Sequence, residues 1–272
     1  MDLSDYLPSE KEFILFQKLV YNRLGISLPI QKRVMLGHRL IKRVRQTGSL
    51  NFTEYFTYIN LLENAVELEI ALELITTNET FFFREDKHFE YLTHHVLPNI
   101  SPNETLKIWS AACSTGEEPY SIAMLLQHHY PAPWKLIASD VNNSVIEHAK
   151  KGIYINERTK FLPDEYRKAY CVKGVDQFEG YMRVKPQLRN KIDFFNFNLL
   201  DDMESLGKLN LIFIRNVMIY FDDDVRQKII NKITRILVPE GWLFISHSET
   251  LHGLKHEFEL IHPAIYKLKA KK

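Results

Sequence analysis

The segment from Leu106 to Asp140 constrains the fold of this chain more than any other. An apolar run at residues 106–111 leads into the small side chains of residues 110–116, a helical pattern follows, and a second apolar run ends at Asp140. This order predicts a strand, a tight loop, a helix and a second strand, the repeating unit of a doubly wound parallel sheet. Because the loop side chains are small, the backbone can approach a ligand at the carboxyl end of the first strand.

Three carboxylates around this loop indicate the kind of ligand. Asp140 follows Glu118 by 22 residues (140 − 118), the spacing at which a carboxylate accepts hydrogen bonds from a ribose cis-diol. Glu117 and Glu118 open the helix where a pyrophosphate binder would place its phosphates, and their charge repels phosphate. The pattern therefore favours an adenosine compound with positive charge, such as S-adenosylmethionine, over NAD. The alternative is a structural strand-to-helix turn with capping acids.

Length and composition exclude several protein classes. The 272 residues are 45% hydrophobic, which is enough to form the core of one large domain, or of one domain with a small second domain. The net charge of +1 gives no overall positive field that would indicate nucleic-acid binding. No run of about 20 apolar residues predicts membrane insertion, and the start of the chain lacks the pattern of a leader peptide. Cys113 and Cys171 are too few for a disulfide framework or a zinc site. We therefore expect a cytoplasmic protein.

A change of periodicity along the chain predicts two domains. From Lys11 to about Ile75 only the helical period occurs, with breaks at residues 25–29, at residues 48–51 and near Asn64, which predicts a small all-α domain over residues 1–75. Residues 76–272 are expected to form an α/β domain with a doubly wound, mostly parallel, Rossmann-like sheet. The predicted strands are residues 106–111, 136–139, 192–195, 209–215, 243–246 and 264–268, and the predicted helices are residues 119–129, 144–150 and 222–237.

Residues 152–191 interrupt this alternation. Prolines and glycines punctuate the segment, and residues 181–185 alternate between apolar and polar side chains. The pattern predicts a helical turn and a small antiparallel β insert, at a sheet rim where partners often bind.

A polar and aromatic cluster at residues 76–85 precedes the sheet. Thr76 and Glu79 have capping-box spacing, which predicts a helix that begins there and runs toward Val96. Three successive phenylalanines at residues 81–83 cannot all face one core from a helix, since neighbours lie about 100° apart. Part of this aromatic surface is therefore expected to cover an adenine ring or the mouth of a site.

Arg84 is the candidate for binding a carboxylate in this cluster. On a helix it would lie one turn beyond Thr80, where its guanidinium holds a carboxylate in a fixed plane. The alternatives are capping roles for Asn78 and Thr80, and a surface ion pair of Arg84 with Glu85 or Asp86.

Polar residues also follow the fourth predicted strand. Arg215, Asn216 and Tyr220 emerge at its carboxyl end, on the same edge as the first loop. Asn198 follows the preceding strand and would reach this edge, where its amide matches the hydrogen-bonding edge of adenine. The alternative for Asn198 is an ordinary turn residue. We interpret His247 as a packing or hydrogen-bonding residue.

Taken together, these segments resemble the CheR family, the chemotaxis receptor glutamate O-methyltransferases. The motifs that carry the resemblance cover nearly the whole chain after the amino-terminal helices. They are residues 77–85 (TNETFFFRE), 109–121 (WSAACSTGEEPYS), 138–140 (ASD), 198–200 (NLL), 215–221 (RNVMIYF) and 247–249 (HSE). Several long motifs in the same order are not expected by chance.

The resemblance implies methyl transfer from S-adenosylmethionine to glutamate side chains on the cytoplasmic helical bundle of chemoreceptors, which yields S-adenosylhomocysteine and serves sensory adaptation. It also implies a small helical domain joined to a doubly wound methyltransferase domain with a β insert. The family positions that line the cofactor site match Asn78, Thr80, Arg84, Glu118, Asp140, Asn198, Leu199, Arg215 and Asn216. Those near the transferred methyl match Arg84 and Tyr220, the expected catalytic residues. No metal is needed, and we expect a monomer.

Two rival functions are less consistent with the sequence. A nucleic-acid amino methyltransferase would grip a flipped base with an aromatic turn that contains prolines, and residues 217–219 (VMI) provide neither. A non-catalytic adaptor would keep the cofactor fold and only bind receptors or respond to the cofactor level, which is less consistent with a chain that has all the matching site residues.

Basic side chains gather on residues 30–46, a segment without a carboxylate. At about 100° per residue they share one side of a helix, opposite an apolar side. A stripe of one sign can steer and orient an acidic receptor bundle, so we expect it to be a docking surface. Its expected docking residues are Lys32, Arg39, Lys42 and Arg43. The alternative is a solvated face that pairs with Glu63, Glu67, Glu69 and Glu73 of a nearby helix.

Overall fold

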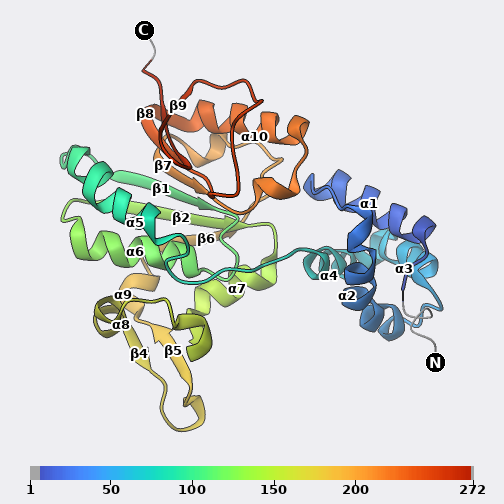
Figure 1. The fold of residues 1–272 in the computed structure, drawn as a ribbon. Helices are drawn as coiled ribbons and strands as arrows, with labels where there is room; N and C mark the ends of the chain where they lie inside the picture. Colours follow the sequence, from blue (N-terminus) through green and yellow to red (C-terminus); the bar gives the residue numbers. More distant parts are fainter. Residues whose placement is uncertain (1–6, 271–272) are drawn as a thin grey trace. The chain divides into compact units, whose positions relative to one another are not determined.

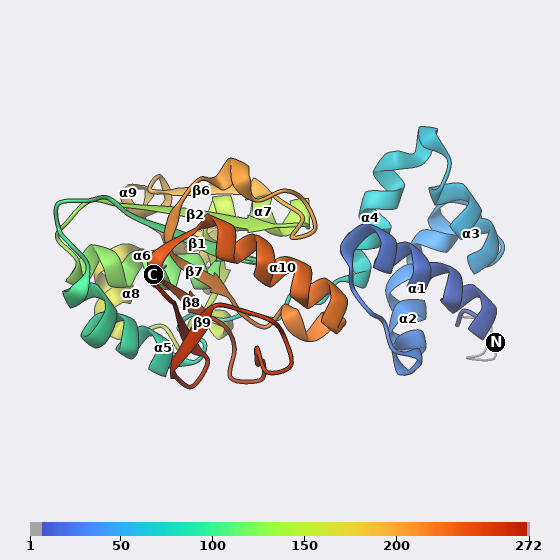
Figure 2. The same cartoon turned by 90° about the horizontal axis from the view of Figure 1, so that it is seen from above.

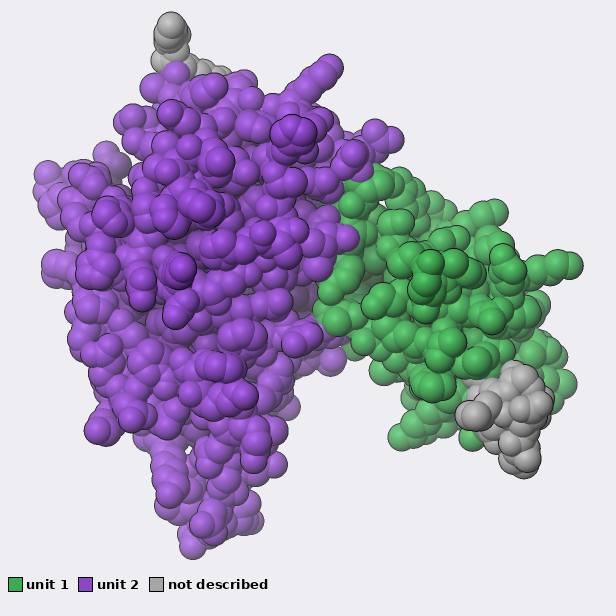
Figure 3. Space-filling model, in the orientation of Figure 1, with its two compact units in different colours: residues 1–77, 220–222 green, residues 78–219, 223–272 purple. Residues whose placement is uncertain are grey.

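The computed structural model describes residues 7–270, which form two compact units (Figure 3). The helical unit contains residues 7–77 together with Tyr220–Asp222, and the sheet unit contains residues 78–219 and 223–270. Within residues 7–270, every helix is too short or too polar to span a bilayer.

Helices α1 to α4 make up most of the helical unit. They are α1 (Glu10–Leu24), α2 (Arg33–Gln46), α3 (Phe52–Ile59) and α4 (Ala65–Ile75), and 3-10 turns occupy Ile30–Lys32 and Leu62–Asn64. Local signals set the helix ends: Ser9 and Glu12 form a capping box at the start of α1, and Gly25 ends it with a φ of 72°. The helix breaks predicted from the sequence are confirmed.

A seven-stranded sheet organises the sheet unit, in the order β6-β2-β1-β7-β8-β10-β9. Neighbours from β6 to β8 run parallel, and β10 pairs antiparallel with β8 and β9. The strands are β1 (Leu106–Ala111), β2 (Trp134–Asp140), β6 (Ile192–Asn196), β7 (Leu209–Ile214), β8 (Leu237–Phe244), β9 (Phe258–His262) and β10 (Ile265–Leu268). The predicted doubly wound, mostly parallel sheet is confirmed.

Helices cover both faces of this sheet. Helices α6 (Glu117–His129) and α7 (Asn143–Lys151) lie on one face, and α10 (Asp223–Ile236) lies on the other (Figures 1 and 2). The strand order reverses between β1 and β7, and ligands of such sheets bind at the carboxyl ends of the strands beside that switch point. The segments that follow β1, β2 and β7 therefore meet at one edge.

Two strands differ from the prediction. The sequence pattern misses β9 because only Phe258 of its five residues is buried, so no apolar alternation marks it. Strand β8 begins at Leu237, directly after α10 and earlier than expected, because the exposed Pro239 and Glu240 hide its first half from a search for apolar runs.

The predicted helix from Thr76 to Val96 is wrong in its first half. Residues 77–85 are not helical, α5 begins only at Asp86 and ends at Tyr91, and a π-helical turn follows over Leu92–Val96. Phe83 and Glu85 have φ angles of 53° and 60°, in the left-handed region that a right-handed helix cannot contain. Because tertiary hydrogen bonds hold this segment, the capping-box spacing did not determine its structure.

The predicted β insert is a three-stranded antiparallel sheet in the order β3-β5-β4. Its strands are β3 (Ile153–Ile155), β4 (Cys171–Lys173) and β5 (Tyr181–Val184), and the short helices α8 (Asp164–Tyr170) and α9 (Pro186–Arg189) accompany them (Figure 1). The insert is tied to the sheet unit through Tyr154, whose hydroxyl donates a 2.7 Å hydrogen bond to the carbonyl of Thr115.

Candidate active site

The backbone of the loop between β1 and α6 turns sharply and packs closely against neighbouring residues. Ala112, Ser114 and Gly116 adopt φ angles of 55°, 49° and 95°. A Cβ at Gly116 would lie 2.8 Å from the Cβ of Ala149, so only glycine fits there. The small residues singled out in the sequence thus shape the loop that faces the switch point.

Asp140 ends β2 and holds this loop in place. Its carboxylate accepts hydrogen bonds from the backbone N–H groups of Ser114 (2.8 Å) and Asn142 (3.0 Å), and the residue is buried. The carboxylate therefore lies at the edge where the sequence placed it, and it is fixed by the two loops that a nucleoside would contact.

Glu117 and Glu118 take different directions. Glu117 is fully buried, accepts a 2.6 Å hydrogen bond from the Thr115 hydroxyl and lies 3.3 Å from Nε of Arg158 in the insert. Glu118 accepts a 2.7 Å hydrogen bond from Ser110 and lies 3.4 Å from Nη1 of Arg215. Burial raises the pKa of both carboxyls. Only Glu118 is directed toward the predicted site residues.

Arg215 is the centre of charge at the end of β7. Its guanidinium, 1% exposed, lies 3.3 Å from Glu85 and 3.4 Å from Glu118, and it donates to the carbonyl of Arg84. Within residues 7–270, its Nε and Nη1 atoms have no hydrogen-bond partner. A buried guanidinium with unused donors is suited to receive an anionic group such as a carboxylate.

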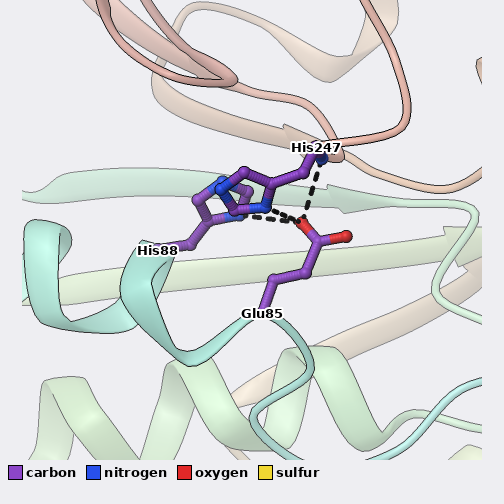
Figure 4. Close-up of side chains that lie close together, drawn as sticks. All are labelled: Glu85, His88 and His247. Atoms are coloured by element: carbon purple, nitrogen blue, oxygen red, sulfur yellow. Dashed lines mark hydrogen bonds and ion pairs between the residues drawn. The ribbon is translucent and has the colours of Figure 1, made fainter.

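Glu85 lies 3.3 Å from Arg215 and also contacts two histidines, His88 and His247. Figure 4 shows Glu85 with the two histidines. Burial raises the pKa of Glu85, but Arg215, Ser246 and the histidines outweigh it and lower the pKa to about 2. Burial and the charge of Arg215 lower the pKa of His88 to about 3, so His88 is neutral near pH 7. The interpretation of His247 as a hydrogen-bonding residue is confirmed by the 3.1 Å distance from its Nδ1 to Glu85.

These three side chains bring their ligand atoms within 4.8 Å of one another, a spacing that fits a metal ion. Their orientation does not fit one. The rings of His88 and His247 stack with centroids 4.5 Å apart and planes 12° apart, whereas imidazole lone pairs lie in the ring plane and cannot converge on one ion from stacked rings. Arg215 already neutralises Glu85 as well, so we interpret the cluster as an electrostatic network around Glu85. His247 is hydrogen-bonded to Glu85 in it, whereas both ring nitrogens of the buried His88 lack a hydrogen-bond partner within residues 7–270.

Residues 78–84 lie against the same edge in an irregular path that turns at Phe82 and Phe83. The Ser114 hydroxyl donates to the carbonyl of Asn78 (3.1 Å), and the N–H of Phe83 donates to Ser121 (2.9 Å). Arg84 is half-buried and donates to the carbonyl of Glu79 (2.8 Å). Within residues 7–270 it forms no ion pair with Glu85 or Asp86, so the alternative of a surface ion pair is wrong.

The three phenylalanines pack on protein rather than forming one free aromatic face. Phe82 contacts Tyr154, Phe83 stacks on Tyr166, and Phe81 contacts Phe161. The expectation that part of this surface covers a ligand assumed a helix, and these residues are not helical.

Asn198, Leu199 and Asn216 lie on loops, and Tyr220 ends a 3-10 turn (Met218–Tyr220). Asn216 has a φ of 59° and donates through Nδ2 to Ser246 (2.7 Å), and Leu199 is buried. Oδ1 of Asn198 accepts a 3.0 Å hydrogen bond from the N–H of Leu200, as in the turn alternative. Tyr220 belongs to the helical unit, where its carbonyl accepts a 2.7 Å hydrogen bond from Ser27.

Sequence reasoning missed Glu85, Arg158, Ser246 and Glu249 as parts of this edge. Glu249 accepts backbone hydrogen bonds from the loop after β7. Burial raises its pKa, although those N–H groups favour the carboxylate. The HSE motif of residues 247–249 was a usable signal, since it follows a strand at the same sheet edge.

The basic stripe on α2 has partly structural roles. Arg39 donates to the carbonyls of Ile75 (2.7 Å) and Thr76 (2.8 Å), at the carboxyl end of α4. Arg43 forms an ion pair with the buried Glu67, which lowers the pKa of that carboxyl. The alternative pairing with the α4 glutamates is therefore correct for Arg43, whereas Lys32 and Lys42 are exposed.

Comparisons with known proteins extend over most of the described chain. The family profile described as "CheR methyltransferase, SAM binding domain" matches residues 78–266, and "CheR methyltransferase, all-alpha domain" matches residues 11–76. The chemotaxis protein methyltransferase of Escherichia coli (strain K12) is 40% identical over 267 residues, which covers 96% of this chain and 91% of that protein. Those of Salmonella typhimurium (strain LT2) and Borreliella burgdorferi are each 38% identical and cover 96% and 92% of this chain and 91% of their own lengths.

Proposed function

The chain belongs to the CheR methyltransferase family, and we propose that its sheet unit binds the cofactor through the residues predicted above while its helical unit docks the receptor. The resemblance seen in the sequence is thereby confirmed. The protein is an S-adenosylmethionine-dependent methyltransferase that forms glutamate methyl esters on chemoreceptors, and S-adenosylhomocysteine is the product.

The residues at the sheet edge fit this cofactor. We assign the ribose to Asp140, whose carboxylate lies beside a loop that admits no Cβ at Gly116. The unused donors of Arg215 suit the carboxylate of the methionine moiety, and Glu118 suits a nearby cation. The other proposed cofactor contacts are Asn78, Thr80, Arg84, Asn198, Leu199 and Asn216. The hydrogen bonds and ion pairs that connect Asn78, Asp140, Arg84, Glu118 and Arg215 at one edge support this assignment most directly.

The chemistry requires orientation rather than a base. S-adenosylmethionine supplies a methyl group on a sulfonium, and a glutamate carboxylate is already ionised at pH 7. Arg84 is proposed to orient the incoming carboxylate, and Tyr220 to donate a hydrogen bond or shape the path of the methyl group. Alignment of the reactants in a dry pocket then provides most of the acceleration.

A labelling assay tests the activity. Incubation with tritiated S-adenosylmethionine and receptor-containing membranes should give label that leaves as methanol in mild base, because a methyl ester hydrolyses there. Stable label would instead indicate N-methylation, the chemistry of the rival nucleic-acid amino methyltransferase class.

Asp140→Ala should weaken the binding of S-adenosylhomocysteine by about 1–3 kcal/mol, because charge-assisted hydrogen bonds to the ribose are lost. Isothermal titration calorimetry measures this directly. Asp193→Ala, which removes an exposed carboxylate on the neighbouring strand β6, is the matched control and should bind like the wild type. An unchanged affinity in Asp140→Ala would remove Asp140 from the ribose site.

We propose that residues 1–75 form the docking domain, residues 76–272 the methyltransferase domain, and residues 152–191 its β insert. The acidic helical bundle of the receptor is the proposed partner of Lys32, Arg39, Lys42 and Arg43. We further propose that the enzyme acts in the cytoplasm as a monomer.

The exposed lysines give the cleanest test of docking. Arg43→Glu would set a carboxylate against the buried Glu67 and disturb folding, whereas Lys32 and Lys42 carry no such contact. Lys32→Glu with Lys42→Glu should raise the receptor KM by roughly 3- to 10-fold and reduce its salt dependence, because charge steering is lost.

Methylation kinetics at low and moderate ionic strength provide the measurement. Lys107→Glu with Lys228→Glu makes the same charge change at exposed positions of the sheet unit and should leave the receptor KM unchanged. If both double variants behave alike, the stripe is a solvated surface and docking lies elsewhere.

A further inference from the structure

The turn that follows β8 contacts both loops that carry predicted cofactor residues. We call residues 246–249 the anchor turn. Its carboxylate, Glu249, accepts hydrogen bonds from three successive backbone N–H groups, those of Asn216 (3.1 Å), Val217 (2.9 Å) and Met218 (2.8 Å). The N–H of Ser246 within the turn adds a fourth at 2.7 Å.

The other end of the anchor turn holds the segment that contains Arg84. The Ser246 hydroxyl donates to Glu85 at 2.7 Å and accepts from Nδ2 of Asn216 at 2.7 Å. The backbone N–H of His247 donates to the second oxygen of Glu85 at 3.3 Å, as Figure 4 shows. Ser246 thus connects the loop after β7 with the segment before α5.

The conformation of the loop after β7 needs such a support. Asn216 has a φ of 59°, a left-handed conformation that is uncommon outside glycine. Three consecutive N–H groups that point to one side are costly to bury without an acceptor. The Glu249 carboxylate satisfies all three, and thereby fixes the backbone directly after Arg215.

We propose that Glu249 is a positioning residue for cofactor binding: through the anchor turn it holds Arg215 and Asn216 in the geometry that receives the methionine moiety. This inference rests on the proposed function, because it assigns those two residues to the cofactor. Glu249 itself is not expected to touch the cofactor. Its effect passes through the backbone. A displacement of about 1 Å in a positioning group can lower the activity of an enzyme about 100-fold.

Glu249→Gln keeps the size of the side chain but removes its negative charge and one of its two acceptor oxygens. The two oxygens of the carboxylate accept hydrogen bonds from four N–H groups. In the glutamine an NH₂ group replaces one of these oxygens, so a donor would face N–H donors. We expect the Kd for S-adenosylhomocysteine and the KM for S-adenosylmethionine to rise roughly 10- to 100-fold. The receptor KM should stay unchanged, and amide hydrogen exchange at residues 216–218 should accelerate.

Glu67→Gln is the matched control, since it alters another carboxylate that accepts several hydrogen bonds, but one that lies in the helical unit. It should lower thermal stability without changing the affinity for S-adenosylhomocysteine. Ser246→Ala keeps the Glu249 carboxylate and removes only the hydroxyl link, so it serves if Glu249→Gln does not fold. We expect it to weaken cofactor binding by about 3- to 10-fold.

The outcomes separate this inference from the proposed function. If Asp140→Ala weakens cofactor binding while both Glu249→Gln and Ser246→Ala bind like the wild type, the positioning role is wrong and the proposed function stands. If the wild type itself does not bind S-adenosylhomocysteine, both are wrong. A Kd that rises with the receptor KM unchanged supports the positioning role.

Discussion

Arg84→Ala is expected to lower the rate of methyl transfer about 100-fold at saturating cofactor and receptor, because the incoming carboxylate loses its orienting partner. The half-buried side chain makes one hydrogen bond, to the carbonyl of Glu79, so the fold should remain intact. Single-turnover kinetics with the receptor measures the effect on the transfer step itself. The Kd for S-adenosylhomocysteine should change much less than the rate.

Two companion variants sharpen this test. Arg84→Lys keeps the charge but loses the planar pair of donors, so its rate should lie between those of the wild type and Arg84→Ala. Lys87→Ala removes an exposed cation three residues further along the chain and should leave the rate unchanged. A wild-type rate in Arg84→Ala would assign Arg84 to the surface.

Arg215→Met is expected to destabilise the sheet unit by about 3–5 kcal/mol near pH 8, because it leaves the carboxylates of Glu85 and Glu118 buried without their cation. Trp109, Trp134 and Trp242, the three tryptophans of the chain, all lie in that unit, so urea unfolding followed by tryptophan fluorescence reports on it alone. Lys150→Met, which breaks the exposed pair with Glu147, should leave the urea midpoint nearly unchanged, because solvent screens that pair.

The difference in the free energy of unfolding between the wild type and Arg215→Met should become smaller as the pH falls from 8 toward 5. In the wild type the pKa of Glu85 is lowered to about 2. The ionised Glu85 therefore stabilises the folded state until the pH falls below the pKa that this carboxyl has in the unfolded chain. Without Arg215, burial raises the pKa values of Glu85 and Glu118 above those of the unfolded chain, and protonation on acidification then favours the folded variant. The pKa of His88 would rise as well, which acts in the same direction. A pH-independent deficit would contradict this account.

The sheet and its first loop were predictable because local composition determines them. The apolar strands β1, β2 and β7 and the small residues before Gly116 carry their signal within a few positions. The path of residues 77–85 was not predictable in this way, since the left-handed conformations of Phe83 and Glu85 accompany hydrogen bonds to Ser121, Ser246 and His247, which are distant in the sequence.

The same distinction applies to the charged residues. Neighbouring carboxylates at residues 117 and 118 look alike in the sequence. Their partners Arg158 and Arg215, which are distant in the sequence, distinguish the buried Glu117 from the site-facing Glu118. Likewise, the sequence shows the basic stripe of α2. The hydrogen bond of Arg39 to Ile75 and the ion pair of Arg43 with Glu67 depend on the packing of α4 beside α2, which the sequence does not show.

The contacts of the insert limit how this enzyme can be recombined with its relatives. Tyr154 and Arg158 belong to the insert, yet Tyr154 donates to the carbonyl of Thr115 and Arg158 pairs with Glu117, where the loop after β1 enters α6. A chimera that exchanges residues 152–191 to change partner choice therefore also exchanges two supports of the loop between β1 and α6. Grafts that keep these two side chains and vary only β4 and β5 separate specificity from catalysis, and the useful crossover points lie inside the insert rather than at its ends.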